Sequence, residues 1–236
     1  MNILLTRRFS QSDLDLIQSW GWSFEMLETL MITPFEVKEI PNAEVWVVSS
    51  RNSWEVVKKF IDRAPGSIYC VGHWMKEELL KRGKSGISGF ENMKKLVTDA
   101  GERNFKSILY FCGDEHRPEL EEGLKNSPTK ISKVITHQSQ MTYPVVKGNF
   151  DAVFVFSPRS AESLLKNNSF DSKTTFACIG STTASYLNGQ GITHTFTPSY
   201  PDCRILLEEF YEATKNHPAT SGGPATTDFE IDNLES

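Results

Sequence analysis

Two segments of the chain repeat one pattern at one spacing, and this internal repeat limits the fold more than any other feature. Val47-Val48-Ser49-Ser50-Arg51 and Val155-Phe156-Ser157-Pro158-Arg159 each place an apolar strand before a serine, one further residue and an arginine. The serine of the first pattern precedes Gly72 by 23 residues, and the serine of the second precedes Gly180 by the same number. A repeat of this kind predicts two related lobes.

Short apolar runs indicate buried strands. They are near-continuous rather than alternating, which is typical of strands that are covered on both faces in parallel sheets. Each is followed by a polar or glycine-containing turn and a segment with helical spacing, so the chain is predicted to have an α/β fold. The runs are 3–5, 45–48, 68–71, 108–112, 152–156 and 176–179, and the helical segments are 54–61, 74–82, 118–125, 161–166, 183–188 and 204–213.

The first apolar run, residues 3–5, is not part of either copy of the repeat. The middle lobe has a third strand–turn unit at 109–117, whereas the C-terminal lobe lacks one after Gly180, because the helical segment from 204 leads into the end of the chain. We therefore expect residues 3–8 to complete the C-terminal lobe.

This assignment divides the chain into two lobes with two crossings. The stretches around Phe35 and Tyr143 alternate and contain a proline, as edge strands do, and they are expected to form an antiparallel connection. The last stretch is rich in Ser, Thr, Gly, Pro and acidic residues and is expected to be disordered. The predicted domains are 1–34 plus 147–215 (lobe 1), 41–138 (lobe 2), the linker strands 35–40 and 139–146, and the tail 216–236.

Composition excludes several classes of protein. The formal net charge of -5 and the absence of basic runs argue against a nucleic-acid-binding protein. No apolar stretch approaches the roughly 18 residues of a membrane span, and the start does not resemble a secretory signal, so we expect a cytoplasmic protein. Cys70, Cys112, Cys178 and Cys203 form no CxxC pair or zinc spacing, which predicts reduced, packed thiols and no metal site.

The turns after the strands form the candidate site. Ligands of open α/β sheets bind beyond the carboxyl ends of the strands, where helix N-termini favour anions. No P-loop or GxGxxG motif occurs there, which argues against a nucleotide site. The candidate binding residues are Thr6, Arg7, Ser49, Arg51, Gly72, His73, Gly113, Ser157, Arg159, Gly180, Ser181, Thr182 and Thr183.

Structural roles remain open for the same residues. Serine and threonine at these positions are ordinary N-caps. Arg51, Arg117 and Arg159 also suit surface ion pairs, and His73 suits an exposed helix start. Asp114 and His116 are weak candidates for acid–base work, and Tyr143 also suits packing between strands.

The motifs of these turns resemble one known family. Phe154-Val155-Phe156-Ser157-Pro158-Arg159-Ser160-Ala161, followed by Ala177-Cys178-Ile179-Gly180-Ser181-Thr182-Thr183-Ala184, resembles uroporphyrinogen-III synthase. The opening Ile3-Leu4-Leu5-Thr6-Arg7 and the turn Cys112-Gly113-Asp114 with Arg117 are also similar to the family, over roughly residues 1–213. The chain departs from it in lobe 2, where the threonine that often follows Gly72 is absent and Ser50 replaces a proline.

The resemblance implies a fold and an activity. The fold is α/β, with two flavodoxin-like lobes that have parallel sheets and are joined by a two-stranded antiparallel linker. The activity is that of a cyclising hydro-lyase of heme biosynthesis, which closes hydroxymethylbilane, a linear tetrapyrrole, with loss of water and inversion of ring D. No cofactor is implied, and we expect a monomer that binds neither nucleic acid nor membrane.

The resemblance also implies roles for single residues. Ser157 and Thr183 match the family's turns, and Tyr143 matches its linker tyrosine, the implied catalytic residue that assists departure of the hydroxyl. Gln140 is the alternative in a shifted register. Helix N-termini, hydroxyls and arginines would bind the substrate carboxylates.

Other functions remain possible interpretations of the same residues. A non-catalytic two-lobed module for a small polycarboxylate would have the same repeat and hinge. A domain for protein–protein recognition is the third alternative.

Overall fold

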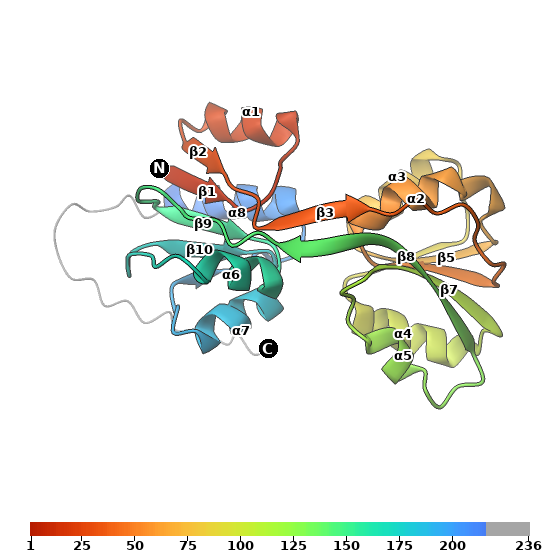
Figure 1. Ribbon diagram of the computed structural model, residues 1–236. Coiled ribbons are helices and arrows are strands. Elements are labelled where there is room, and N and C mark those ends of the chain that lie inside the picture. The colour runs from red at the N-terminus through yellow and green to blue at the C-terminus, as the bar shows by residue number, and fades with distance from the viewer. Residues whose placement is uncertain (216–236) are drawn as a thin grey trace, which may run out of the picture.

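The computed structural model describes residues 1–215, so the predicted tail 216–236 lies outside the described residues. The described chain forms two lobes, each built on its own sheet, with two long strands running side by side between them (Figure 1). This two-lobed α/β architecture confirms the predicted fold class. Within residues 1–215, no helix is long and apolar enough to cross a membrane.

Lobe 1 contains a parallel five-stranded sheet in the order β11-β10-β9-β1-β2. Read in chain order this is 2-1-3-4-5, the flavodoxin arrangement. Helices α1 and α8 pack on one face of the sheet, and α6 and α7 pack on the other. The strands are β1 (Asn2–Leu5), β2 (Ser23–Met26), β9 (Ala152–Val155), β10 (Thr175–Cys178) and β11 (Thr195–Phe196), and the helices are α1 (Gln11–Ser19), α6 (Pro158–Leu165), α7 (Ser181–Gly189) and α8 (Cys203–Lys215).

Lobe 2 contains a six-stranded sheet in the order β3-β8-β7-β4-β5-β6. All of its pairs are parallel except β3 with β8. The strands are β3 (Leu30–Pro34), β4 (Val45–Val48), β5 (Ser67–Val71), β6 (Ile87–Phe90), β7 (Ser107–Gly113) and β8 (Lys130–Met141), and the helices are α2 (Trp54–Lys59), α3 (His73–Lys81), α4 (Met93–Arg103) and α5 (Glu119–Gly123), with 3-10 turns at Arg51–Ser53 and Ile61–Arg63.

Burial on both faces explains why the central strands have continuous apolar sequences. In β4, Val45 and Val47 pack with Leu96 of α4, whereas Trp46 and Val48 pack with Leu79 of α3. Every residue of β4 and β9 is therefore buried. The four cysteines are also buried and unpaired, as predicted.

The first strand completes lobe 1, as its isolated position in the sequence predicted. β1 pairs in parallel with β9 on one side and with β2 on the other. The domain bounds themselves stay a prediction, because they depend on where the linker is cut.

The strands between the lobes lie elsewhere than expected. Leu30–Pro34 pairs with residues 137–141 of β8, whereas we expected 35–40 to pair with 139–146. Residues 35–44 form no strand because Val37 and Ile40 turn into the core of lobe 2. The other end of β8 continues in parallel with β7, so this strand belongs to both the linker and the sheet.

Several elements had no clear sequence signal. Strands β2, β6 and β11 and helices α1 and α4 were not predicted. Strand β11 followed by α8 is a third strand–helix unit after Gly180, which corrects the expectation that lobe 1 lacks one. Its strand is only two residues long and half-buried, so no apolar run marks it.

Candidate functional site

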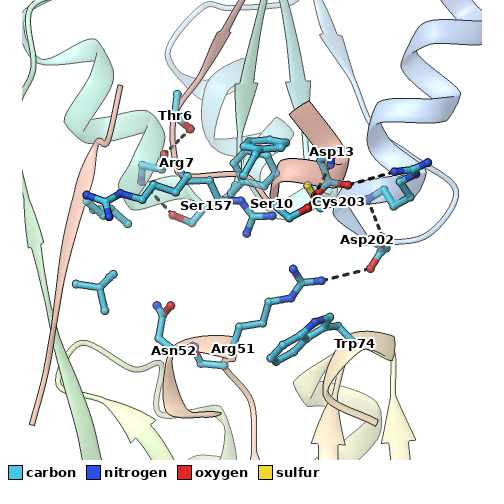
Figure 2. Close-up of a pocket in the computed structure, with 18 of the residues that line it drawn as sticks. Thr6, Arg7, Ser10, Asp13, Arg51, Asn52, Trp74, Ser157, Asp202 and Cys203 are labelled. Carbon is cyan, nitrogen blue, oxygen red and sulfur yellow. Dashed lines mark hydrogen bonds and ion pairs between the residues drawn. The ribbon is translucent and has the colours of Figure 1, made fainter. Parts of the chain in front are cut away.

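A cavity of about 1140 Å³ lies between the lobes. Figure 2 shows side chains of lobe 1 on one side of it and Arg51, Asn52 and Trp74 of lobe 2 on the other. Its lining comprises Thr6, Arg7, Arg8, Phe9, Ser10, Asp13, Glu28, Thr29, Leu30, Ile32, Ser50, Arg51, Asn52, His73, Trp74, Glu77, Phe156, Ser157, Ser160, Tyr200, Asp202, Cys203, Arg204 and Ile205.

Sheet topology explains why these residues meet. In lobe 1, Thr6 and Ser157 follow the neighbouring parallel strands β1 and β9, where the chain order of the strands reverses. In lobe 2, Arg51 and His73 follow the neighbouring strands β4 and β5. The crevice beyond the strand ends at a reversal such as that between β1 and β9 is the usual ligand site of open α/β sheets.

Helices α1, α3, α6 and α8 begin at this cavity, so their positive ends face it. Ser10 and Ser157 accept hydrogen bonds from the first turns of α1 and α6, and Asp202 accepts one from Arg204 N of α8 at 2.7 Å. Helix α3 differs, because its cap is Gly72, which has no side chain and a φ of 90° that favours glycine. Its first amides are left without a side-chain cap and suit an anionic ligand.

Most of the charged groups in the lining are paired with one another. Within the described residues, Arg8 pairs with Glu28 at 3.0 Å, Arg204 with Asp13 at 3.4 Å, and His73 Nε2 with Glu77 at 2.9 Å. Arg51 Nη2 lies 3.5 Å from Asp202 Oδ2, and this pair joins the two lobes. The cavity therefore contains balanced charge rather than a large excess of positive charge.

Arg7 is the exception. Within residues 1–215 it forms no ion pair, and its buried Nε has no hydrogen-bond acceptor. Its guanidinium carbon lies 3.9 Å from the centre of the Phe156 ring, a cation–π contact that holds the group at the cavity. A buried donor without an acceptor is costly, and a ligand carboxylate would supply one.

Burial shifts the pKa of several groups that line the cavity. It lowers the pKa of Arg51, and the nearby positive charge of Arg7 lowers it further, against the raising effect of Asp202. Burial raises the pKa of the Cys203 thiol, which argues against a thiolate nucleophile there. Burial also raises the pKa of Tyr200, so its hydroxyl keeps its proton at neutral pH.

The structure brings some of the predicted site residues to the cavity. These are Thr6, Arg7, Arg51, His73 and Ser157. The Thr6 hydroxyl donates to the carbonyl of Phe154 at 2.7 Å, so its side chain also serves the interior of lobe 1.

Other predicted residues lie outside the lining and serve the lobes. Ser49 Oγ lies 3.0 Å from the hydroxyl of Tyr110. Gly113 packs so closely on His137 that an added Cβ would lie 2.7 Å from its Nε2. Arg159 donates to the carbonyl of Ser139 at 3.1 Å.

The turn at Gly180 with Ser181, Thr182 and Thr183 also lies outside the lining. The loop before α8 passes beside it, since a Cβ added at Gly180 would lie 3.8 Å from Pro201. Thr183 is buried within lobe 1, whereas Ser181 and Thr182 are exposed.

Tyr143 follows β8 and does not line the cavity. Its backbone has a φ of 50°, its N–H donates to Ser163 Oγ of α6, and its carbonyl accepts from Asn167 Nδ2 just beyond α6, so these two residues hold the turn. Its side chain is 44% exposed. Among the described residues, Tyr200 is the tyrosine that lines the cavity.

Sequence reasoning missed the segment from Tyr200 to Ile205, which supplies much of the wall in lobe 1. Its sequence Tyr200-Pro201-Asp202 precedes an apolar helix, and an aspartate in that position is a recognisable N-cap signal. Trp74 of lobe 2 was also missed as a site residue, because it looked like part of an amphipathic helix.

No group of three or more His, Cys, Asp or Glu side chains within residues 1–215 is arranged to hold a metal ion. Nor do the lining residues include a glycine-rich phosphate loop.

Comparisons with known proteins agree on one family. Residues 24–208 match the family model described as uroporphyrinogen-III synthase HemD. A comparison with curated protein sequences found no match.

Solved structures show the same fold at low sequence identity. The uroporphyrinogen-III synthetase of Helicobacter pylori is 16% identical, with a TM-score of 0.62, and the match covers 90% of this chain and 99% of that one. The wild-type uroporphyrinogen III synthase of Thermus thermophilus is 12% identical, with a TM-score of 0.50, covering 93% and 100%. A mutant of the Thermus protein in another crystal form reaches 0.59 at 12% identity, covering 92% and 100%.

Proposed function

Because the chain belongs to the uroporphyrinogen-III synthase family, the cyclising lyases of tetrapyrrole biosynthesis, we propose that it converts hydroxymethylbilane to uroporphyrinogen III with loss of water and inversion of ring D. The cavity between the lobes carries this proposal. Its volume of about 1140 Å³ exceeds the range of about 300–1,000 Å³ that is common for small-molecule pockets. A linear tetrapyrrole is a ligand of that larger size.

Carboxylate recognition is assigned first to Arg7. Its guanidinium is half-buried, held on Phe156 and unpaired within residues 1–215, so a substrate carboxylate gains a charge-assisted hydrogen bond there without breaking another ion pair. The uncapped first turn of α3 at His73 and Trp74 offers backbone amides to a second carboxylate from the opposite lobe. Ser157 and Arg51 complete this set. The other candidate residues lie outside the lining and affect substrate binding indirectly, by fixing the shape of the turns. They are Ser49, Gly72, Gly113, Arg159 and residues 180–183.

The proposed reaction begins with departure of the terminal hydroxyl. A proton is donated to this hydroxyl, the carbon–oxygen bond breaks, and water leaves as the pyrrole nitrogen lone pair forms an azafulvene. The substituted carbon of ring D attacks the azafulvene carbon to give a spiro intermediate. That intermediate opens and closes again with ring D inverted, and the ring carbon releases a proton, which balances the proton donated at the start.

The protein contributes geometry to these steps. The bilane closes without inversion when it is unassisted, so the conformation of the bound chain decides the isomer. Fixing the carboxylates from both lobes restricts the bilane to conformers in which the spiro attack is possible, and such positioning is a large source of rate enhancement.

The proton donor is a tyrosine hydroxyl in this proposal. Tyr143 is the family-derived candidate, but it lies outside the lining in an exposed turn. Tyr200 lines the cavity, and burial raises its pKa, so its hydroxyl is protonated and able to donate a hydrogen bond to the leaving hydroxyl. Substitution of each tyrosine separately decides between them.

The decisive experiment is isomer analysis with hydroxymethylbilane. The purified chain is incubated with freshly prepared bilane, the products are oxidised to uroporphyrins, and isomers I and III are separated by chromatography. Type III in excess, formed faster than spontaneous closure, is expected. Type I alone at the spontaneous rate contradicts the proposal and favours the alternative of a non-catalytic polycarboxylate-binding module.

We propose a cytoplasmic monomer that works without a cofactor and whose partner is the linear tetrapyrrole, not nucleic acid or membrane.

A further inference from the structure

The ion pair between the lobes is built differently from the others at the cavity. Arg51 Nη2 and Asp202 Oδ2 lie 3.5 Å apart, longer than the roughly 2.7–2.9 Å of a strong charge-assisted hydrogen bond. Figure 2 shows Arg51 reaching from lobe 2 towards Asp202. The other ion pairs of the lining each join two residues of the same lobe, as Arg8 and Glu28 of lobe 1 do.

Asp202 has only one oxygen free for Arg51. Its Oδ1 accepts from the backbone N–H of Arg204 at 2.7 Å and of Ile205 at 3.4 Å, and so caps α8. Arg51 therefore receives a single, long contact rather than a bidentate one. Its side chain is 43% exposed and lies with its guanidinium carbon 4.9 Å from the Trp74 ring centre, so the remaining donors face the cavity.

A second cation lies close to the same place from lobe 1. Arg7 lines the same cavity as Arg51, its positive charge lowers the pKa of Arg51, and its buried Nε has no acceptor. Two guanidinium groups from opposite lobes thus line the cavity, but only Arg51 contacts the Asp202 carboxylate, which is also held by a helix. A carboxylate that is free of the helix can approach both arginines more closely.

We propose that Asp202 holds the place of a substrate carboxylate: it neutralises Arg51 across the cleft, and a carboxylate of the bound tetrapyrrole that pairs with Arg51 and Arg7 displaces it. This inference rests on the proposed function for the identity of the ligand. The displaced Asp202 keeps its helix cap, so the exchange costs only the weak contact between the lobes. Substrate then replaces Asp202 as the bridge between the lobes.

Because Asp202 both caps α8 and pairs with Arg51, a substitution that removes only its charge can test the ion pair separately from the cap. Asp202→Asn removes the charge but keeps an oxygen that accepts from Arg204 N, since asparagine is as good an N-cap as aspartate. Glu212→Gln is the matched control, because it removes one charge and one ion pair, to Lys215, from the exposed side of the same helix.

Uroporphyrin III, a stable polycarboxylated tetrapyrrole, serves as the binding probe, by fluorescence titration of the full chain. Asp202→Asn is expected to bind it about two- to five-fold more tightly, the range that corresponds to a partly exposed ion pair. Arg51→Gln also removes the pair but is expected to bind more weakly. Small-angle scattering without ligand is expected to show a larger radius of gyration for both variants, and Glu212→Gln is expected to match the unmodified chain in both measurements.

Equal or weaker binding by Asp202→Asn, or an unchanged radius of gyration in both variants, overturns the inference. Neither measurement requires turnover. If the unmodified chain forms no type III isomer while Asp202→Asn binds the porphyrin more tightly, the proposed function fails and the exchange stands. If type III forms and binding does not tighten, only the exchange fails.

Discussion

Thr29 Oγ1 lies 2.6 Å from Ser160 Oγ, and both side chains are buried. This bond ties the residue before β3 to the first turn of α6. Lobe 2 has a counterpart, in which Ser53 Oγ lies 2.9 Å from Thr136 Oγ1 of β8. The start of β3 is thus fixed to lobe 1, and the part of β8 at Thr136 is fixed to lobe 2, each by a buried hydroxyl pair. We expect bending between the lobes in the stretch of the two strands that lies between these two pairs.

Ser160→Ala is expected to lower the free energy of unfolding by about 1–3 kcal/mol, because it leaves the buried Thr29 hydroxyl with a weaker set of partners. Urea denaturation followed by circular dichroism measures the change. Ser185→Ala, at an exposed position in α7, is the control and should be neutral or slightly stabilising. Equal effects at the two positions would mean that the buried pair adds nothing.

Gly113→Ala is expected to destabilise the chain by about 1–3 kcal/mol, the usual cost of overpacking, because its Cβ would lie 2.7 Å from the buried ring of His137. Gly189→Ala is the matched control, since nothing lies within 4 Å of its added Cβ. Thermal unfolding of the two variants should separate them by several degrees. A stable Gly113→Ala variant with impaired ligand binding would instead support a direct role for this turn.

Stability is expected to fall as the pH drops below about 6.5, because burial lowers the pKa of His137. The unfolded chain then binds a proton that the folded chain excludes, so its stability is complete above the unfolded pKa and is lost towards the lowered folded pKa. His137→Asn keeps a polar atom near Thr136 and should flatten the pH dependence of the unfolding free energy below about pH 6.5. An unchanged slope would assign the acid sensitivity to other groups.

Arg7→Gln is expected to raise the KM for hydroxymethylbilane by about 10- to 100-fold, which corresponds to the loss of a hydrogen bond to a charged group. Arg8→Gln is the control, because Arg8 is largely exposed and already paired with Glu28. Steady-state kinetics on both variants gives the comparison. If the two KM values rise equally, general positive charge rather than the Arg7 site binds the substrate.

Tyr200→Phe is expected to lower kcat by at least about 10-fold, as the loss of a general acid does, while Tyr143→Phe has a smaller effect. The reason is their position, since Tyr200 lines the cavity and Tyr143 lies in an exposed turn. Single-turnover measurements of type III formation test the order. The reverse order would return the proton-donor role to the family's linker tyrosine.

The sequence predicted those parts of the fold that are buried on both faces. β4 and β9 have four consecutive apolar residues because helices cover both sides of them. β2, with the sequence Ser23-Phe24-Glu25-Met26, lies at a sheet edge and is mostly exposed, so its sequence lacks that pattern. β11 is too short to show any pattern.

The sequence predicted that the site lies at the carboxyl ends of the strands, but it did not predict which of the turns there meet at one cavity. Arg7 and Arg51 follow strands whose carboxyl ends face the gap, as the repeat indicated. Gly180 follows a neighbouring strand and belongs to the best sequence motif, yet Pro201 lies beside it and the turn does not line the cavity. Asp202 reaches Arg51 only through tertiary structure, since 151 residues separate them.

The pairing of β1 between β9 and β2 has a consequence for synthesis of the chain. The first two strands leave the ribosome long before β9, which follows the whole of lobe 2. The continuous lobe 2 is therefore complete while Ile3, Leu4 and Leu5 have β2 beside them but still lack β9, and these side chains are fully buried in the finished protein. Co-translational folding is expected to begin in lobe 2. Until β9 emerges, the edge of β1 that it covers in the finished protein has no partner.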